Sequence, residues 1–351
     1  MFKTICLKKL LSSAIVGVII GSIFLIFTST SPFSFFKEIP FLNFTKNQTP
    51  ISYAQSVQTA APAVVNVYNS NINRAPELGS GVIISHKGYI ITNKHVINHA
   101  DKIIVALQNG QIYEASLIGS DSLTDLAVLK IDADNLHVIP MNQNRITRVG
   151  DVVLAIGNPY NLGQTITQGI ISATGRVGLS GSGRQNFLQT DAPINQGNSG
   201  GALVNTLGEL VGINTLSVDT AKSYGQVPEG IGFAIPAALA IKVMHKLILH
   251  GRVIRGYIGI AGSDYPLFYE DKQNHFRGIK VNHVSPNGPA VLSGVQKGDI
   301  ILSLNNKRSH STIETMDQVA EIPPGSQIPI VVLRNGKNIN LNITIIENPY
   351  N

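Results

Sequence analysis

Three short strings in the middle of the chain carry side chains that together could perform acyl transfer. They are Thr92-Asn-Lys-His95, Thr124-Asp125-Leu-Ala and Gly197-Asn-Ser199-Gly-Gly201. A serine hydroxyl is a poor nucleophile at neutral pH, so it needs a neutral imidazole to accept its proton and a carboxylate to orient that imidazole. Glycines beside the serine let backbone N–H groups turn toward a developing oxyanion. One string alone would mean little, but together they make a serine endopeptidase the first hypothesis.

The order of these residues along the chain narrows the type of enzyme. Histidine comes first, aspartate second and serine third. This is the order of chymotrypsin-type proteases, whereas subtilisins and α/β-hydrolases have other orders.

Composition limits the fold class and the partners. With 351 residues the chain is long enough for two domains and additional segments. The 33 glycines and the 43% hydrophobic share suit a β-rich globular protein. The net charge is +6, but Lys3, Lys8 and Lys9 supply half of it, so we expect no nucleic-acid partner. Cys6 is the single cysteine, so an intrachain disulfide is ruled out and stability must come from a packed core.

The N-terminal region has the pattern of a membrane anchor. Residues 10–27 are uncharged and mostly aliphatic, which reaches the roughly 18–20 residues needed to cross a bilayer core. The three lysines in front favour an N-terminus held in the cytoplasm, with the rest of the chain exported. We therefore expect a cytoplasmic segment at 1–9 and a retained anchor at 10–28. A signal peptide cleaved near Ser29–Ser31 is the alternative.

The rest of the chain divides into a linker and two units. Residues 29–59 are polar and turn-rich, which predicts a linker. In residues 60–251, short β-type runs such as Val152-Val-Leu-Ala-Ile156 alternate with glycine and asparagine turns. Close-spaced strands without helices between them are typical of antiparallel barrels. Near the end of this unit, Pro236 and Gly251 bracket a predicted helix. Residues 252–351 combine β-type runs with a helix-compatible stretch at 312–320, which suits a small α+β unit.

The chain resembles the HtrA/Deg family of serine proteases. The resemblance covers about residues 60–346 and is most specific in the three strings that carry the histidine, the aspartate and the serine. Its second unit is similar to a PDZ domain. The strings that carry the resemblance are Gly79-Ser-Gly-Val-Ile-Ile, Gly88-Tyr-Ile-Ile-Thr-Asn-Lys-His95-Val-Ile, Ser122-Leu-Thr-Asp125-Leu-Ala-Val-Leu-Lys, Thr190-Asp-Ala-Pro-Ile-Asn-Gln-Gly-Asn-Ser199-Gly-Gly-Ala-Leu-Val-Asn205 and Gly298-Asp-Ile-Ile.

The resemblance implies a mainly β fold: a chymotrypsin-like double antiparallel β-barrel at 60–251, then a small α+β PDZ domain at 252–351, with an N-terminal transmembrane helix. It also implies roles for the site residues. Ser199 is the expected nucleophile and His95 the general base and acid. Asp125 orients the imidazole, and the N–H groups of Gly197 and Ser199 form the oxyanion hole.

The substrate pocket is expected around Ile194, Asn198 and Leu216, where family members shape their primary specificity. Neither the segment around Ile194 and Asn198 nor the segment around Leu216 carries an acid at a suitable position. This argues against a preference for Lys or Arg and favours a small aliphatic residue before the scissile bond. We see no cluster at metal-ligand spacing and expect no cofactor and no metal.

The second unit predicts regulation by peptides. Tyr257-Ile258-Gly259-Ile260 matches the loop by which PDZ domains bind a C-terminal carboxylate. Arg255, just before it, is expected either to add positive charge there or to form a surface salt bridge. Family likeness makes Arg176 a candidate relay from this unit to the protease, with Asp317 as its ion partner.

The resemblance is closest to the membrane-anchored regulatory members of the family that carry one PDZ domain. It implies a homotrimer in the cell inner membrane, with a periplasmic catalytic domain. The implied substrate is a membrane-bound anti-sigma factor of the envelope stress response, and the implied activators are C-terminal peptides of misfolded outer-membrane proteins. A general periplasmic quality-control protease and a non-catalytic PDZ chaperone or scaffold are the alternatives.

Overall fold

In the computed structural model the chain forms two compact units, residues 1–52 and residues 53–351. Within the first unit, residues 13–24 are helical, and the remainder of the predicted anchor at 10–28 lies outside the described residues. No helix in the described part of the chain has both the length and the apolar character needed to cross a bilayer. The structure describes residues 13–24, 52–71, 74–176, 187–215, 230–267 and 276–349.

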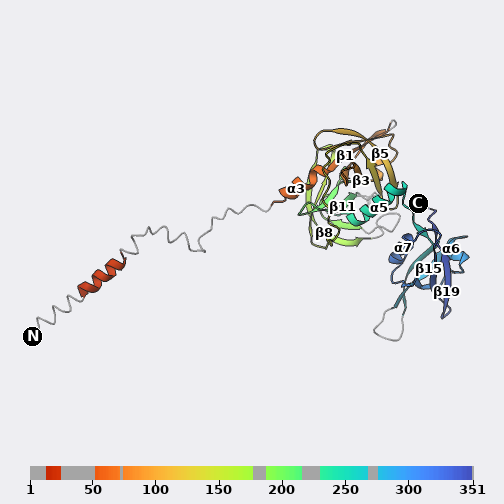
Figure 1. The fold of residues 1–351 in the computed structure, drawn as a ribbon. Helices are drawn as coiled ribbons and strands as arrows, with labels where there is room; N and C mark the ends of the chain where they lie inside the picture. Colours follow the sequence, from red (N-terminus) through yellow and green to blue (C-terminus); the bar gives the residue numbers. More distant parts are fainter. Residues whose placement is uncertain are drawn as a thin grey trace, which may run out of the picture. The chain divides into compact units, whose positions relative to one another are not determined.

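Helix α3 (Ala54–Ala60) and the 3-10 turn η1 (Ala61–Ala63) lead into a first closed barrel with the strand order β1-β2-β3-β6-β5-β4 (Figure 1). The side chains in its strands alternate between core and solvent, as in β4, where Ile103 and Val105 are buried while Lys102 is exposed. The strands are β1 (Val64–Asn71), β2 (Arg74–Ile83), β3 (Tyr89–Asn93), β4 (Lys102–Ala106), β5 (Ile112–Asp121) and β6 (Leu126–Lys130).

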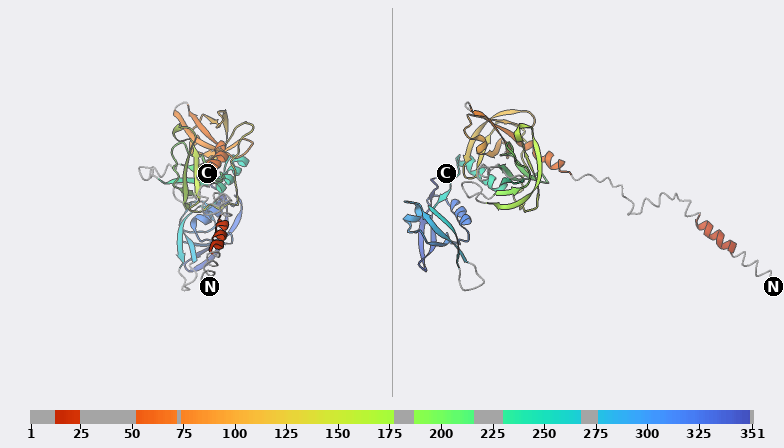
Figure 2. Two further views of the ribbon diagram at one scale, coloured as in Figure 1. Left: turned by 90° about the vertical axis from the view of Figure 1, so that its left-hand side faces the viewer. Right: turned by 180° about the vertical axis from the view of Figure 1, so that it is seen from behind.

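A second closed barrel follows the first along the chain (Figure 2). Its strand order is β10-β11-β12-β9-β8-β7. One hydrophobic cluster joins the two barrels, because Val82 and Ile91 of the first pack with Ile156 and Ile213 of the second. The candidate active site lies at this junction. The strands are β7 (Val152–Gly157), β8 (Thr165–Arg176), β9 (Phe187–Thr190), β10 (Ala202–Asn205), β11 (Leu210–Thr215) and β12 (Gly232–Pro236), with the 3-10 turn η3 (Pro159–Asn161) after β7.

Helix α5 (Ala237–His250) ends the barrel region and packs against β5, β6 and β11. Its apolar side chains Val243, Met244 and Leu247 join the core that the two barrels share. Gly251 ends the helix in the left-handed conformation, at φ 69°, and its N–H donates to the carbonyl of Leu247 at 2.8 Å. The helix expected between Pro236 and Gly251 is therefore present.

The last unit has its own core and its own sheet. Strand β13 (Gly256–Tyr257) pairs with β20 (Ile346–Glu347), and the main sheet runs β14-β15-β16-β18-β19, with β17 beside β16. Ile279, Ile301 and Val332 lie in its buried cluster. The prediction of two barrels followed by a small α+β unit is confirmed. The remaining elements are β14 (Ile260–Leu267), β15 (Phe276–Val284), α6 (Pro289–Leu292), β16 (Ile300–Leu304), β17 (Lys307–Arg308), α7 (Thr312–Ala320), β18 (Gln327–Arg334) and β19 (Lys337–Thr344).

Candidate active site

Strand pairing in the first barrel brings the predicted histidine and aspartate together. His95 starts the 3-10 turn η2 (His95–Ile97), two residues after β3 ends, and Asp125 stands immediately before β6. The two strands are antiparallel neighbours, with Asn93 opposite Leu126. Because antiparallel pairing sets the end of one strand beside the start of the other, the residues that follow β3 lie beside the residues that precede β6.

The His95 and Asp125 side chains are in direct contact. His95 Nδ1 lies 2.6 Å from Asp125 Oδ2, and the backbone N–H of His95 donates to Oδ1 at 3.0 Å. The backbone N–H of Lys94 and the side-chain amide of Asn93 each donate to the Asp125 carbonyl at 2.9 Å. These bonds hold Asp125 at φ 54°, a conformation that aspartate adopts more readily than most residues. With the carboxylate on Nδ1, the second ring nitrogen Nε2 is left to act as a base.

A contact that sequence analysis missed reaches this carboxylate from the second barrel. Thr215, the last residue of β11, is buried, and its hydroxyl lies 3.5 Å from Asp125 Oδ2. The two residues are 90 positions apart, and no local pattern around Thr215 connects it to Asp125. Only the closure of the two barrels onto a common core brings them together.

The turn that carries Ser199 is shaped by main-chain hydrogen bonds. The N–H of Gly200 donates to the Asn214 carbonyl at 2.8 Å, and the N–H of Asn214 donates to the Gly201 carbonyl at 2.9 Å. Gly197 has φ 101°, and a Cβ there would lie 2.3 Å from the carbonyl oxygen of Asn158. The conformation and the close approach both require glycine at this position. Ser199 itself is buried.

The two predicted oxyanion donors, the N–H groups of Gly197 and Ser199, lie in this same turn. The carbonyl of Gln196, which shares a peptide plane with the Gly197 N–H, accepts a hydrogen bond from the N–H of Tyr160 at 3.0 Å. Because a trans peptide directs its C=O and N–H to opposite sides, this bond also orients the Gly197 N–H. Tyr160 sits at φ 53° in η3, so an unusual backbone conformation presents its N–H to the turn.

The predicted pocket residues are buried or lie outside the described residues. Ile194 packs with Val153, Leu203 and Ala234 in the core of the second barrel. Asn198 is almost completely buried, and its Oδ1 has no hydrogen-bond partner within the described ranges. Leu216 lies outside the described residues. The assignment of these three residues to the substrate pocket stays a prediction.

The predicted carboxylate-binding loop connects β13 to β14. Gly259 has φ 76° and its carbonyl accepts from the N–H of Ser285 at 2.8 Å, while Ile258 is buried in the core of the unit. The Tyr257 hydroxyl lies 2.7 Å from the Ser285 hydroxyl. Both contacts come from Ser285, the residue that follows β15, and Ile260 starts strand β14 directly after the loop.

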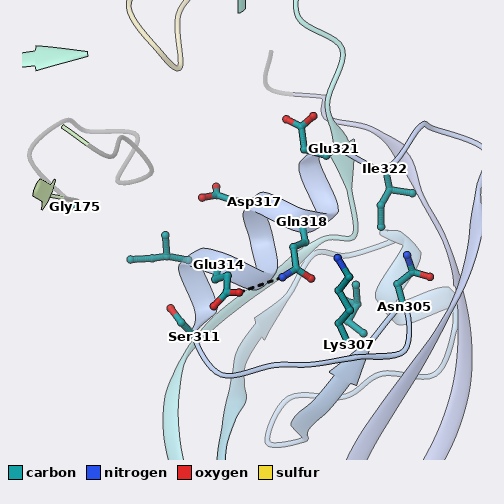
Figure 3. A pocket seen from close by; sticks show the side chains of 11 residues that line it. Gly175, Asn305, Lys307, Ser311, Glu314, Asp317, Gln318, Glu321 and Ile322 are labelled. Carbon is teal, nitrogen blue, oxygen red and sulfur yellow. Dashed lines mark hydrogen bonds between the residues drawn. The ribbon is translucent and has the colours of Figure 1, made fainter. Parts of the chain in front are cut away.

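The two relay candidates lie on different elements. Arg176 is the last residue of β8, and its Nε donates to the Gln189 side chain at 2.9 Å. Asp317 lies on α7 and lines a cavity of about 810 Å³ together with Gly175, the residue before Arg176 (Figure 3). Figure 3 shows the Asp317 carboxylate on the side of α7 that faces Gly175. An ion pair between Arg176 and Asp317 stays a prediction.

Arg255 forms a buried ion pair, which corrects the expectation of a surface salt bridge or a charge on the peptide loop. Its guanidinium donates to both carboxylate oxygens of Asp121, at 2.7 and 2.6 Å, and the side chains are 8% and 6% exposed. Thr124, the neighbour of Asp125, donates its N–H to Asp121 at 3.1 Å and also its hydroxyl. Burial raises the pKa of Asp121, but the hydrogen bonds and charge of Arg255, together with Thr124, outweigh this and leave the pKa below its usual value.

Within the described ranges, no group of three or more His, Cys, Asp or Glu side chains is placed to hold a metal ion. What the arrangement offers is an imidazole with an oriented free nitrogen, a serine in a glycine-rich turn and backbone N–H donors in that turn. This set suits acyl transfer.

Comparison with known proteins agrees with this geometry. Residues 79–213 match the family model described as a trypsin-like peptidase domain, and residues 256–345 match the model of a PDZ domain. The chain is 59% identical to serine endoprotease DegS of Escherichia coli (strain K12), over 97% of this chain and 98% of that protein. The crystal structure of the serine endoprotease from Yersinia pestis is 65% identical, with a TM-score of 0.73 over 86% of this chain and 100% of that one. A structure of the HtrA-type protease AlgW with a tripeptide is 46% identical, with a TM-score of 0.77 over 85% of this chain and 98% of that one.

Proposed function

The chain belongs to the DegS-type serine endoproteases of the HtrA family, and from this membership we propose that its PDZ unit switches proteolysis at Ser199, His95 and Asp125. The observation that carries the catalytic assignment is the 2.6 Å contact between His95 Nδ1 and Asp125 Oδ2. This contact sets the tautomer in which Nε2 is unprotonated, and it stabilises the imidazolium that forms when Nε2 takes a proton.

In the proposed reaction, Ser199 Oγ attacks the scissile carbonyl while His95 Nε2 takes the hydroxyl proton. The carbonyl oxygen becomes an oxyanion that accepts hydrogen bonds from the N–H groups of Gly197 and Ser199. Collapse of this intermediate breaks the C–N bond, and His95 gives its proton to the leaving amine. Water then attacks the acyl group, again with His95 as the base, and releases the acid and free Ser199.

Labelling with a fluorophosphonate tests this assignment. Ser199 Oγ forms a bond to phosphorus, fluoride leaves and His95 takes the proton, so the label reports nucleophile and base together. We expect one label per chain at Ser199, loss of the label in Ser199→Ala, and near-complete loss in His95→Ala. His137→Ala is the matched control and should label at the wild-type rate. Labelling that persists in His95→Ala would contradict the assignment.

The PDZ unit is proposed to receive an apolar C-terminal peptide. Such a peptide would add as a strand along the open edge of β14, with its carboxylate at the N–H groups of residues 257–260. One support is Gly259, which adopts a positive φ that favours glycine. Another is the likeness to AlgW, which is known in structures with a tripeptide and with a decapeptide. Binding would shift the protease from a misformed to a formed oxyanion hole. A coupling of about 1–3 kcal/mol would change activity by roughly 5- to 150-fold.

Arg176 is proposed as the relay for this signal, with Asp317 as its ion partner in the peptide-bound form. Support comes from the shared cavity, which Asp317 lines together with the residue before Arg176. The test compares peptide-stimulated labelling of Ser199 in the wild type and in Arg176→Ala, with Arg148→Ala as the control. We expect the stimulation to fall in Arg176→Ala alone. Equal stimulation in all three chains would reject the relay.

The proposal also covers location and substrate. Residues 10–28 would anchor a homotrimer in the inner membrane with the protease in the periplasm, where it cuts a membrane-bound anti-sigma factor in response to misfolded outer-membrane proteins. Support comes from the apolar N-terminal run and the DegS relatives. The test measures cleavage of candidate membrane-bound regulators by the full chain in proteoliposomes, with and without short apolar C-terminal peptides. Peptide-dependent cleavage supports a signalled switch. Peptide-independent degradation of unfolded proteins would indicate a quality-control protease, and no cleavage at all a scaffold.

A further inference from the structure

Ser80 is a buried residue of the first barrel whose polar groups serve the nucleophile turn of the second. It lies in β2 and is 0% exposed. Its N–H donates to the Ser199 carbonyl at 2.8 Å, and its hydroxyl donates to the Gly197 carbonyl at 2.7 Å. The same hydroxyl accepts from the N–H of Asn158 at 3.1 Å, and the Ser80 carbonyl accepts from the Thr92 hydroxyl at 2.7 Å.

The backbone of the turn lies directly against Ser80. A Cβ on Gly200 would come within 2.1 Å of the Ser80 carbonyl oxygen, and a Cβ on Gly201 within 3.2 Å of the Ser80 Cβ. Glycine at position 200 is therefore required for this approach, whereas glycine at 201 is required mainly by the Ile156 carbonyl oxygen, 2.3 Å from such a Cβ. The contact joins residues 117 positions apart, from Ser80 to Gly197.

Four consecutive carbonyls in the turn, those of residues 196–199, are each held by a hydrogen bond. Gln196 accepts from the Tyr160 N–H, Asn198 from the Gly201 N–H, and Ser199 from the Ser80 N–H. These three bonds come from the main chain. The Gly197 carbonyl is held instead by the Ser80 hydroxyl, so this is the bond in the set that a change of side chain removes.

The Gly197 carbonyl belongs to the peptide plane between the two proposed oxyanion donors. At the other end of that plane, the N–H of Asn198 donates to the Asn195 carbonyl at 3.0 Å. Gly197 sits at φ 101° and has no Cβ, so its side of the plane is less restricted. Without the Ser80 hydroxyl, the buried Gly197 carbonyl and Asn158 N–H would both lose a partner. A shift of this plane could give the carbonyl a new partner, but it would strain the Asn198 bond and displace the adjoining plane that carries the Ser199 N–H.

We propose that Ser80 is the positioning residue of the oxyanion hole, because its hydroxyl holds the carbonyl end of the peptide plane between the donors, whereas the other three carbonyls of the turn accept main-chain N–H groups. This inference rests on the proposed function, in which the N–H groups of Gly197 and Ser199 receive the oxyanion.

The test is the second-order rate of fluorophosphonate labelling of the full-length chain, measured against pH. In this reaction the phosphonyl oxygen occupies the oxyanion hole while Ser199 Oγ attacks phosphorus. Ser80→Ala should lower the rate by about 10- to 100-fold, which is less than the loss expected on removing a donor outright. The midpoint of the pH profile should stay at the wild-type value because His95 and Asp125 are untouched. Ser80→Thr keeps a hydroxyl and should recover most of the rate.

Ser56→Ala is the matched control. Ser56 is also buried, and its hydroxyl also donates to a main-chain carbonyl, that of Thr206. This variant should label at the wild-type rate, although it too loses a buried serine hydroxyl. Amide hydrogen exchange gives a readout that needs no activity. The Asn158 N–H loses its acceptor in Ser80→Ala and should exchange faster there, whereas in Ser56→Ala its exchange rate should not change.

The inference would be overturned if Ser80→Ala labelled at the wild-type rate or with a shifted pH midpoint. It would also be overturned if Ser56→Ala were slowed equally, or if the exchange rate of the Asn158 N–H did not change in Ser80→Ala. A wild-type chain that fails to label at Ser199 would instead contradict the proposed function, with the hydrogen exchange of Asn158 still deciding whether Ser80 holds the turn.

Discussion

In the first barrel, the His95 and Asp125 side chains bind each other at 2.6 Å, whereas in the second barrel the Ser199 turn is held mostly by main-chain hydrogen bonds and by glycines in left-handed conformations. The proposed acid–base pair therefore depends on the chemical identity of two side chains. The turn around Ser199 depends on backbone shape, so an added methyl group is enough to disturb it. The two barrels should accordingly respond to different kinds of substitution.

The largest effect is expected at Asp125, where the charge can be removed with little change of shape. In Asp125→Asn the amide no longer selects the tautomer with a free Nε2, and the labelling rate of Ser199 should fall by about 10⁴-fold. Asp151→Asn is the control, since this exposed carboxylate accepts a hydrogen bond from the Arg148 N–H. A rate within tenfold of the wild type in Asp125→Asn would remove the basis for the proposed acid–base pair.

The buried pair beside Asp125 should have the next largest effect, on stability. Arg255→Ala leaves the Asp121 carboxylate buried without its partner, which should lower the free energy of unfolding by about 3–5 kcal/mol at pH 7. Arg252→Ala is the control, because that arginine is 60% exposed and pairs with Glu347 at the surface. It should cost less than about 1 kcal/mol. Denaturant titration of both variants measures the difference, and equal losses would show that burial of the pair is unimportant.

The pH dependence of stability checks the same pair. The pKa of Asp121 is lowered on folding, so its contribution is present above the ordinary value of 3.8 and is lost as pH falls through the folded-state pKa. In Arg255→Ala, only the Thr124 hydrogen bonds oppose the effect of burial on Asp121, so its pKa should rise relative to the wild type and protonation would relieve the buried charge. The destabilisation of this variant relative to the wild type should therefore shrink as the pH falls below about 4. A difference that grows in acid would contradict the lowered pKa.

Gly197→Ala tests whether backbone shape controls the second barrel. The new Cβ would meet the Asn158 carbonyl at 2.3 Å, so the turn must shift, and the labelling rate should fall by about 10²- to 10³-fold. Gly163→Ala is a close control, since Gly163 has nearly the same φ, 100°, but open space around a Cβ. Both variants carry the conformational strain, and only the first has the collision. Equal rates in the two variants would mean that strain alone explains the loss.

The smallest effect is expected at Thr215, where the second barrel touches the acid–base pair. Thr215→Val keeps the shape and removes a hydroxyl 3.5 Å from Asp125 Oδ2, which should lower the labelling rate by about 2- to 10-fold. Thr167→Val is the control, because its hydroxyl donates to the Pro193 carbonyl instead. An effect as large as that of Asp125→Asn would show that the pair depends on the second barrel as much as on its own strands.

Much of the fold could be predicted because its signals are local. Short runs such as Val152–Gly157 alternate with turns, and the helix between Pro236 and Gly251 has its own start and stop residues. The candidate site residues could also be selected from the sequence, because His95, Asp125 and Ser199 each stand in a short string typical of one kind of chemistry, and glycines flank Ser199. Burial of Ile194 and of the Arg255 pair could not be predicted, since both depend on what packs around them.

The side chains available for acyl transfer, and the glycines that allow the turn around Ser199 to form, can be read directly from the amino-acid sequence. The bonds that hold these parts cannot, because Thr215 on Asp125, Arg255 on Asp121 and Ser80 on Gly197 join residues 90, 134 and 117 positions apart. A turn or a strand is encoded by neighbours along the chain. A hydrogen bond between distant segments forms only after their apolar faces have packed together.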